Sequence, residues 1–432
     1  MDLKKEFKIL SIVVAAIAVC WFLPAGKEWF DKAVLGSLQL VKWYAREHVL
    51  FCLLPAFFIA GAISTFVSKA AVIKYFGAKA NKFIAYSVAS LSGVILAVCS
   101  CTVLPLFAGI YKRGAGIGPA TAFLYSGPAI NVMAIILTAR ILGYELGIAR
   151  AVGAILFSVV IGLCMQLIFR NDKGLEAETD MPELNEAEPH PIYADIVLFA
   201  LMVGLLVFAN WAKPETQGGI WGAVFAIKWW LVGIAYLGTG LVGIKFFGLN
   251  KLITAIGMAA VVIFAVIFPK IPQVPFIAGI AVFSLATGRG TIESKDWLDW
   301  TWYYGKTILP LLFGGVLLAG FLLGPPGGQG IIPQEWISNA VGGNSLQSNF
   351  FASVAGAFMY FATLTEVPIL QGLIQNGMGK GPALALLLAG PALSLPNMLV
   401  IRKVMGTKKT FAYVCLVVIL ATLSGIIFGA FF

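Results

Sequence analysis

The chain contains more long apolar runs than a water-soluble protein can bury. Runs of about 20 residues, enough to cross roughly 30 Å of hydrocarbon as a helix, recur along all of its length. Of the 432 residues, 60% are apolar and 12% are charged. A chain with so few charges cannot cover a water-facing surface, which excludes a soluble enzyme and a disordered scaffold. The sequence therefore predicts an all-α polytopic membrane protein.

Thirteen runs are candidate membrane helices, and we expect ten to thirteen of them to span. The run at 9–25 is interpreted as an uncleaved first span rather than a signal peptide, because no small-x-small cleavage site follows it. Lysines interrupt the runs between 219 and 290, which are the weakest candidates. The other candidates are 49–68, 83–111, 117–142, 147–169, 191–212, 223–247, 251–268, 272–287, 303–323, 348–375, 380–401 and 411–431.

A polar stretch divides the chain into parts. Residues 171–190 are rich in acids without the ligand spacing of a Ca²⁺ loop, so we interpret them as a solvated acidic linker. The first membrane half is then 1–170, the middle membrane segment is 191–300 and the second membrane half is 301–432.

The net charge of +10 is interpreted as loop charge that sets orientation, not as a nucleic-acid surface. Two basic clusters, at 69–82 and 402–409, contain no acid and should both face the cytoplasm. With thirteen spans, the acidic linker falls on the opposite side.

An internal similarity links the two halves. Residues 81–143 align with 344–406 at an offset of 263 without a gap, and 18 of the 63 pairs are identical. Many carriers consist of two such repeats and hold the substrate between them, where Gly and Pro interrupt corresponding helices. Whether the repeats are parallel or inverted stays open, because merging two weak spans would invert one of them. The identical pairs include Gly93 with Gly356, Pro105 with Pro368, Gly127 with Gly390 and Pro128 with Pro391.

Four prolines in these repeats predict broken helices. Each lacks the N–H that a helix interior needs and releases the carbonyl four residues earlier. In hydrocarbon such a carbonyl must be satisfied by protein, water or a ligand, so we expect the breaks to face the bundle interior or a polar cavity. Gly127 and Gly390 tolerate the non-helical backbone that precedes a proline. The prolines are Pro105, Pro128, Pro368 and Pro391.

Cys99 and Cys101 lie directly before the first of these prolines and are followed by Thr102. Residues two apart in an intact helix point to nearly opposite sides, so the two thiols share one ligand only where the backbone unwinds. Paired thiolates suit soft ions such as trivalent arsenic, antimony, Cu(I) or Zn. The alternative is that both cysteines pack as small buried hydrophobes.

Glu366 is the one carboxylate near the middle of a strongly apolar run. An acid inside a membrane span commonly carries a proton, binds a cation or serves as a counter-ion, so we predict that Glu366 couples transport to protons. The alternative is a glutamate whose carboxylate reaches toward the interface. The second repeat has no thiols where the first has Cys99 and Cys101, so the two sites differ chemically.

Uncharged polar groups complete the predicted binding site. Asn131 and Asn397 stand beside the two Gly-Pro-Ala breaks and either line the path or satisfy loosened backbone. The chain has no phosphate-binding loop, which favours coupling to an ion gradient, and we expect no cofactor and no enzymatic activity. The predicted substrate-binding residues are Cys99, Cys101, Thr102, Pro105, Gly127, Pro128, Asn131, Thr365, Glu366, Pro368, Gly390, Pro391 and Asn397.

The segment 98–135, VCSCTVLPLFAGIYKRGAGIGPATAFLYSGPAINVMAI, strongly resembles the predicted permeases of the YraQ type, a family that includes the ArsP organoarsenical efflux permeases. The similarity is long in 83–143, is supported in 348–403, and does not extend to the middle segment. It implies an inner-membrane permease. Arsenic-handling relatives export trivalent organoarsenicals with membrane cysteines as ligands, and Cys99 and Cys101 are the matching positions here.

The leading hypothesis is a multi-pass permease of the cell inner membrane that exports a soft metalloid or metal species. Cys99 and Cys101 would bind the cargo, and Glu366 would carry the coupling proton. One alternative is a permease for a small anion or sulfur compound held by freed backbone groups, Asn131 and Thr365. Others are a membrane thiol-disulfide relay and a non-transporting assembly subunit. Its expected partners are the lipid bilayer and the small cargo, and the sequence is compatible with a homo-oligomer.

Overall fold

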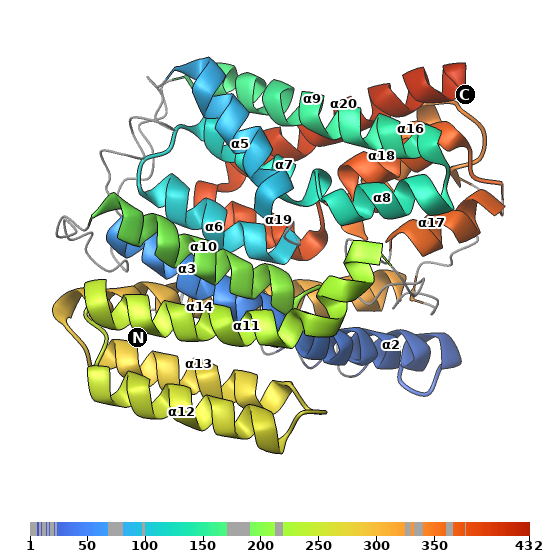
Figure 1. Ribbon diagram of the computed structural model, residues 1–432. Helices are drawn as coiled ribbons and strands as arrows, with labels where there is room; N and C mark the ends of the chain where they lie inside the picture. Colours follow the sequence, from blue (N-terminus) through green and yellow to red (C-terminus); the bar gives the residue numbers. More distant parts are fainter. Residues whose placement is uncertain are drawn as a thin grey trace.

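The fold is described by a computed structural model over residues 24–67, 81–96, 100–170, 191–211, 219–324, 330–331, 340–359, 366–375 and 377–432, with a few single positions before residue 24 (Figure 1). These residues are built from helices, which confirms the predicted all-α membrane fold. The run at 9–25 lies largely outside the described residues, and the acidic linker 171–190 lies wholly outside them.

Two five-helix units follow one another in the same order. The helices α9 and α20 each have 25 residues, and both their starts and their ends are 263 residues apart. Gly114 and Gly377, also 263 apart, both have φ of +98°, a conformation that suits glycine. The first unit is α5 Lys82–Leu96, α6 Ser100–Lys112, α7 Ile117–Ala129, α8 Val132–Ile141 and α9 Tyr144–Ile168. The second is α16 Leu346–Phe358, α17 Glu366–Gln375, α18 Lys380–Ala389, α19 Leu395–Met405 and α20 Thr407–Phe431.

The Gly-Pro-Ala motifs break helices as predicted. The first motif ends α7 at Ala129, and α7 and α8 are bent by 45°. In the second unit α18 ends at Ala389, directly before Gly390, and α19 begins at Leu395. The prolines lie at the two breaks, since Pro128 is the second-last residue of α7 and Pro391 follows the end of α18 by two residues, and each lacks the N–H that a continuing helix needs.

The predicted breaks do not occur at Pro105 and Pro368, because both prolines lie within described helices. Pro368 is the third residue of α17, where the missing N–H removes no helical hydrogen bond. Pro105 is the sixth residue of α6, so it leaves the Cys101 carbonyl without its helical donor although the helix continues to Lys112.

The helices α5 and α6 form a hairpin that enters and leaves at the same end of the bundle. Tyr86, near the start of α5, lies against Gly118 at the start of α7, and α7 follows directly after α6. The helices α16 and α17 form the corresponding hairpin, closed by an antiparallel bridge between Gly342 and Met378. The runs 83–111 and 348–375, which the sequence predicts as spans, are therefore hairpins rather than crossings.

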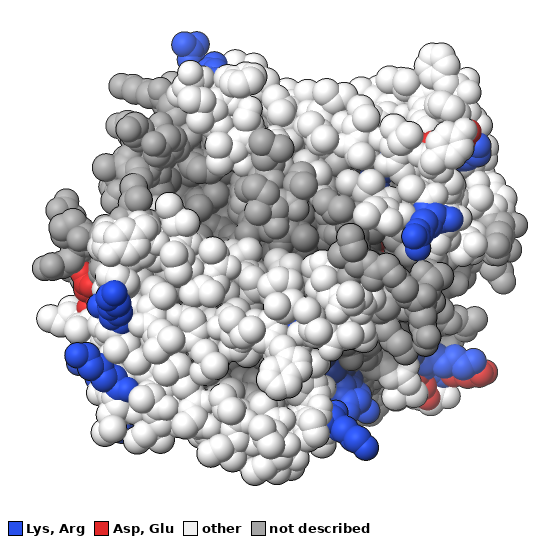
Figure 2. Space-filling view, in the orientation of Figure 1, with Lys and Arg blue, Asp and Glu red and all other residues white. Residues whose placement is uncertain are grey.

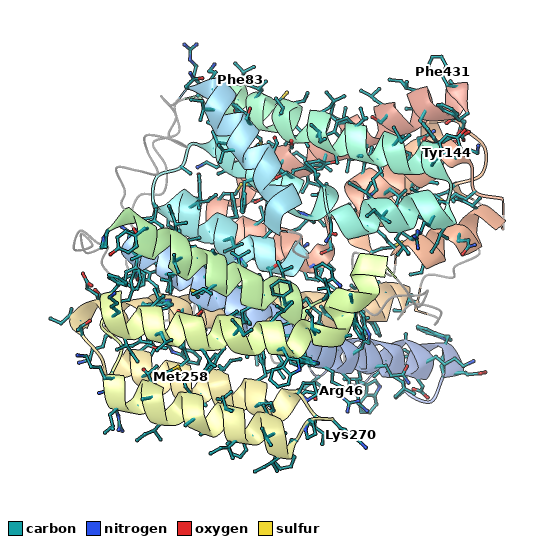
Figure 3. All side chains as sticks on the ribbon, in the orientation of Figure 1. Arg46, Phe83, Tyr144, Met258, Lys270 and Phe431 are labelled. Carbon is teal, nitrogen blue, oxygen red and sulfur yellow. The ribbon has the colours of Figure 1, made fainter. Side chains whose placement is uncertain are left out.

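The two units run in opposite directions. Tyr144, which starts α9, and Phe431, which ends α20, lie at the same end of the molecule (Figure 3). Near the centre, the Tyr125 hydroxyl donates to the Leu388 carbonyl at 3.0 Å, and these two positions are 263 residues apart. Contact between counterpart positions is what a two-fold axis produces. The relative orientation that the sequence leaves open is thus antiparallel.

Three helix ends next to the predicted loops lie at one end of the bundle. Lys409, at the start of α20, donates to the hydroxyl of Tyr111 at the end of α6. The helix α9 also finishes there, because Gln166 accepts a hydrogen bond from Tyr86 near the start of α5. The acidic linker and the basic cluster 69–82, apart from its last two residues, lie outside the described residues, so the sides on which they lie stay predictions.

The remaining helices form the centre and one outer layer (Figure 1). A continuous run made of α2 Glu28–Tyr44, a π-helical segment η1 Ala45–Leu53 and α3 Leu54–Phe66 packs along α14 Ile292–Leu323. The outer layer consists of α10 Ile192–Ala209, α11 Gly219–Phe246, α12 Lys251–Ile267 and α13 Gln273–Gly288.

The surface suits a bilayer. Leu156, Ile263 and Ile427 are among many large apolar side chains exposed on the outer helices. Charged side chains gather toward the edges of the visible face (Figure 2). Among the described residues, five helical runs are long and apolar enough to cross a membrane, or six when the bent pair of α7 and α8 counts as one. The helices α10, α12, α13 and α18 are apolar but shorter.

Glycine lets the long helix of each unit approach its neighbour closely. A Cβ on Gly162 of α9 would lie 2.7 Å from the Gly118 carbonyl oxygen of α7. In the second unit, a Cβ on Gly425 of α20 would lie 2.7 Å from the Gly381 carbonyl oxygen of α18. These are counterpart contacts, and small residues at such contacts allow tight helix packing in membranes.

We predict that Gly162→Ala and Gly425→Ala each destabilise the protein by about 1–3 kcal/mol, because a backbone carbonyl cannot move away from the added methyl group. The midpoint of thermal unfolding in detergent measures this. Gly314→Ala on α14 is the matched control, since its Cβ would meet nothing within 4 Å. Equal midpoints for all three variants would contradict the close-packing account.

Candidate functional site

The hairpins and the helix breaks bring the predicted site residues to the interior. Thr102 near the start of α6 and Pro128 at the end of α7 are buried, and Gly127 touches Val103 so closely that a Cβ would lie 2.5 Å from its methyl group. The helices α6 and α7 thus meet at Gly127. Pro105 is buried as well, as are Gly390 and Pro391 in the turn that follows α18.

Four predicted residues are only partly described or not described. Cys99 and Thr365 lie outside the described residues. Cys101 in α6 and Pro368 in α17 have a described helical backbone, while their side chains lie outside the description. Among the described residues no group of three His, Cys, Asp or Glu side chains clusters as metal ligands would. Cargo ligation by Cys99 and Cys101 therefore stays a prediction.

Asn131 and Ser394 stabilise the helix starts at the two breaks. The Asn131 Oδ1 accepts a hydrogen bond from the Ala134 N–H at 3.4 Å, and the Ser394 Oγ accepts one from the Asn397 N–H at 3.4 Å. These are N-cap contacts, which satisfy backbone groups that a helix start leaves free. The Asn397 side chain is buried, and its Oδ1 has no hydrogen-bond partner among the described residues.

Glu366 is the first residue of α17 and is fully buried, so it does not reach toward the interface. It forms an ion pair with the equally buried Arg150 of α9. The pair joins the hairpin of the second unit to the long helix of the first unit. Burying two charges costs a large desolvation free energy. Removing one partner would leave the other as an uncompensated buried charge.

Arg150 is the site residue that the sequence analysis missed. It lies four residues into the apolar run that begins at 147, where an arginine near the end of a span usually signals orientation. The sequence signal that could have identified this pair was an arginine inside one apolar run and a lone glutamate inside another. Only the fold shows that these two charges meet, because they are 216 positions apart in the chain.

Hydroxyl groups extend the polar cluster around the ion pair. The Arg150 Nη1 donates to the Thr138 Oγ1 of α8 at 2.9 Å, and that hydroxyl donates to the Ala134 carbonyl at 2.6 Å. Tyr413 of α20 occupies the position 263 residues after Arg150, and its hydroxyl is buried without a partner among the described residues. The two counterpart positions therefore differ in charge, so the site is chemically asymmetric.

A second interunit ion pair lies at the end of the bundle and is of a different kind. The Lys380 Nζ of α18 and the Glu145 Oε2 of α9 are 2.9 Å apart, and their side chains are 48% and 31% exposed. Because water screens such a pair, it contributes little to stability. It offers a control for the buried pair, since it joins the same helix α9 to the second unit.

Comparison with known proteins gives a consistent result. The model of a family described as predicted permease, ArsP_1, matches residues 34–430. The UPF0718 protein MJ0584 of Methanocaldococcus jannaschii is 42% identical over 394 residues, covering 89% of this chain and 93% of that protein. The UPF0718 protein YraQ of Escherichia coli is 38% identical over 86 residues, covering 20% of this chain and 24% of that protein. No solved structure matches.

We predict that Arg150→Met and Glu366→Met each destabilise the protein by about 3–5 kcal/mol, because each leaves a buried charge unpaired. The double variant should lose less stability than the sum of the two single-variant losses, since it removes both charges. Thermal unfolding of the four proteins in detergent forms a double-mutant cycle. The same cycle on Glu145 and Lys380 should give a coupling of at most about 1 kcal/mol. Additive losses at Arg150 and Glu366 would show that the pair does not interact.

Proposed function

This chain belongs to the predicted-permease family, and we propose that it is a proton-coupled secondary permease of the cell inner membrane that exports a soft metalloid or metal species. The observation that carries the proposal is the buried ion pair between Glu366 and Arg150, which joins α17 of the second unit to α9 of the first. Carriers built in this way hold cargo between the units and expose it to either side by moving one unit against the other.

The arrangement of helices supports alternating access. The hairpin helices α5 and α6 enter the bundle from one end, and α16 and α17 enter it from the opposite end. The breaks of α7 and α18 are buried as well. Non-helical backbone at this depth is tolerated where protein or a cavity surrounds it, which is where a carrier places its cargo.

Cys99 and Cys101 are the proposed cargo ligands. Cys101 is the second residue of α6, and Cys99 precedes that helix in the sequence. An unwound backbone at Cys99 would let both thiols face one ion, which an intact helix would prevent. Thiolates favour soft cargo such as trivalent organoarsenicals over hard cations.

Glu366 is the proposed proton carrier, and its ion pair with Arg150 provides a mechanism by which protonation would change the structure. With Glu366 ionised, the ion pair ties α17 to α9; with Glu366 protonated, the attraction is lost and the second hairpin is free to separate from α9. Protons arriving from one side would thus favour one arrangement of the two units.

A small anion is the second candidate cargo, and Arg150 is the observation that favours it. When a proton neutralises Glu366, the guanidinium needs another negative partner, because a buried unpaired charge is strongly unfavourable. An anionic cargo would supply that charge between Thr138 and Glu366. Under this alternative the cysteines pack and bind nothing.

We predict that the wild type lowers the accumulation of methylarsenite or another thiol-binding species in an efflux-deficient host and that Cys99→Ser/Cys101→Ser abolishes the effect. Methylarsenite, arsenite, antimonite, zinc and copper are measured in cells with equal amounts of protein. Cys164→Ser and Cys415→Ser, in α9 and α20, are the matched controls and should behave as wild type. Unchanged export by the double variant would eliminate thiolate ligation and favour an anion as cargo.

We predict that Glu366→Gln stops net transport driven by a pH gradient in vesicles but preserves exchange of labelled for unlabelled cargo, because exchange needs no net proton movement. Glu145→Gln is the control, since its carboxylate is partly exposed and pairs at the end of the bundle. Normal pH-driven transport by Glu366→Gln would refute the coupling role, whatever the cargo.

A further inference from the structure

The outer layer contains an apolar groove that neither unit uses. It lies between α3, α10, α11, α12 and α13 and has a volume of about 200 Å³. Its walls include Phe58, Met202, Trp229, Val262 and Phe276. The groove reaches the surface at Gly233 of α11, whose Cβ would meet nothing within 4 Å. We call this feature the α11–α13 groove.

The α11–α13 groove offers few hydrogen-bonding groups to a polar cargo. Tyr236 lines it, but its hydroxyl donates to the Gly279 carbonyl at 3.2 Å. Thr239 also lines it, and its hydroxyl donates to the Ala235 carbonyl at 2.8 Å. The Trp229 indole N–H is the one other polar side-chain nitrogen or oxygen in the lining, whereas binding sites for polar molecules present several converging polar groups. The groove therefore suits hydrocarbon.

Basic side chains lie at one end of the α11–α13 groove. Lys270 is exposed in the turn whose neighbours Pro269 and Pro272 line the groove. Arg46 of η1 is exposed and lies at the same end as Lys270 (Figure 3), where Phe51 of η1 contacts Phe276 with ring centroids 4.9 Å apart. Both cations therefore lie toward this end of the groove.

The charges of the outer layer also favour an anionic ligand. Residues 216–292 contain no Asp or Glu, and all their charges are positive: Lys228, Lys245, Lys251, Lys270 and Arg289. The groove end thus has no local acid from this segment to neutralise Lys270. Basic pockets between membrane helices bind the head groups of anionic lipids.

We propose that the α11–α13 groove binds one anionic phospholipid, with an acyl chain along Trp229, Tyr236 and Phe276 and the phosphate between Lys270 and Arg46. An acyl chain fits a groove with so few polar groups in a region from which water is excluded, and the phosphate matches the two cations. The lipid would connect α12 and α13 to η1 and α3, so it joins the outer layer to the centre of the protein.

The test is intact-protein mass spectrometry of the full chain in detergent, titrated with phosphatidylglycerol or with phosphatidylcholine of the same acyl chains. Wild type should bind one phosphatidylglycerol more tightly than phosphatidylcholine. Arg46→Gln and Lys270→Gln should each weaken phosphatidylglycerol binding about fivefold and leave phosphatidylcholine unchanged. Equal affinity for both lipids in the wild type would overturn the proposed head-group contacts.

A groove-filling variant tests the acyl chain. Gly233→Leu places a side chain in the α11–α13 groove without a backbone clash and should abolish binding of both lipids. Gly314→Leu, at an exposed glycine of α14 with equal space, should bind as wild type. If Gly233→Leu retains the lipid, the proposal is wrong. If Gly233→Leu retains it but changes the oligomeric state, the groove is a contact for a second copy of the chain.

Discussion

The structure depends on one constraint of the lipid environment, which is that every backbone polar group at membrane depth must be satisfied by the protein itself. The two Gly-Pro-Ala breaks would each be unfavourable against lipid. Both are buried inside the bundle, and Asn131 and Ser394 cap the helices that restart after them. The close α7–α9 and α18–α20 contacts at glycine make this enclosure tight.

The same interior contains the buried ion pair. Arg150 and Glu366 come from different units, so their attraction connects the units directly, whereas Lys380 and Glu145 connect them where water screens the charges. This distinction gives the proposed coupling a physical basis. A proton can change the contact between the units only where the carboxylate and its partner are shielded from water. The counterpart positions, Tyr413 for Arg150 and Val103 for Glu366, are uncharged, so the pair is not repeated between them.

The internal alignment of the sequence predicted much of the structure of the two five-helix units. The offset of 263 predicted equivalent helix breaks at Gly127 and Gly390, because proline removes the same hydrogen-bond donor wherever it stands. The comparison failed at 83–111 and 348–375, since an apolar run of this length is compatible with either one span or a returning hairpin.

Composition, run length and the Gly-Pro pattern by themselves determined that the chain is an α-helical membrane protein with two broken-helix segments, because those features act through local hydrogen bonding and hydropathy. They also identified Glu366 as a charge without a local partner. Only the tertiary structure decided that the units are antiparallel, that Arg150 is that partner and that the outer layer encloses a groove. These are contacts between residues far apart in the chain, and the packing of whole helices decides them.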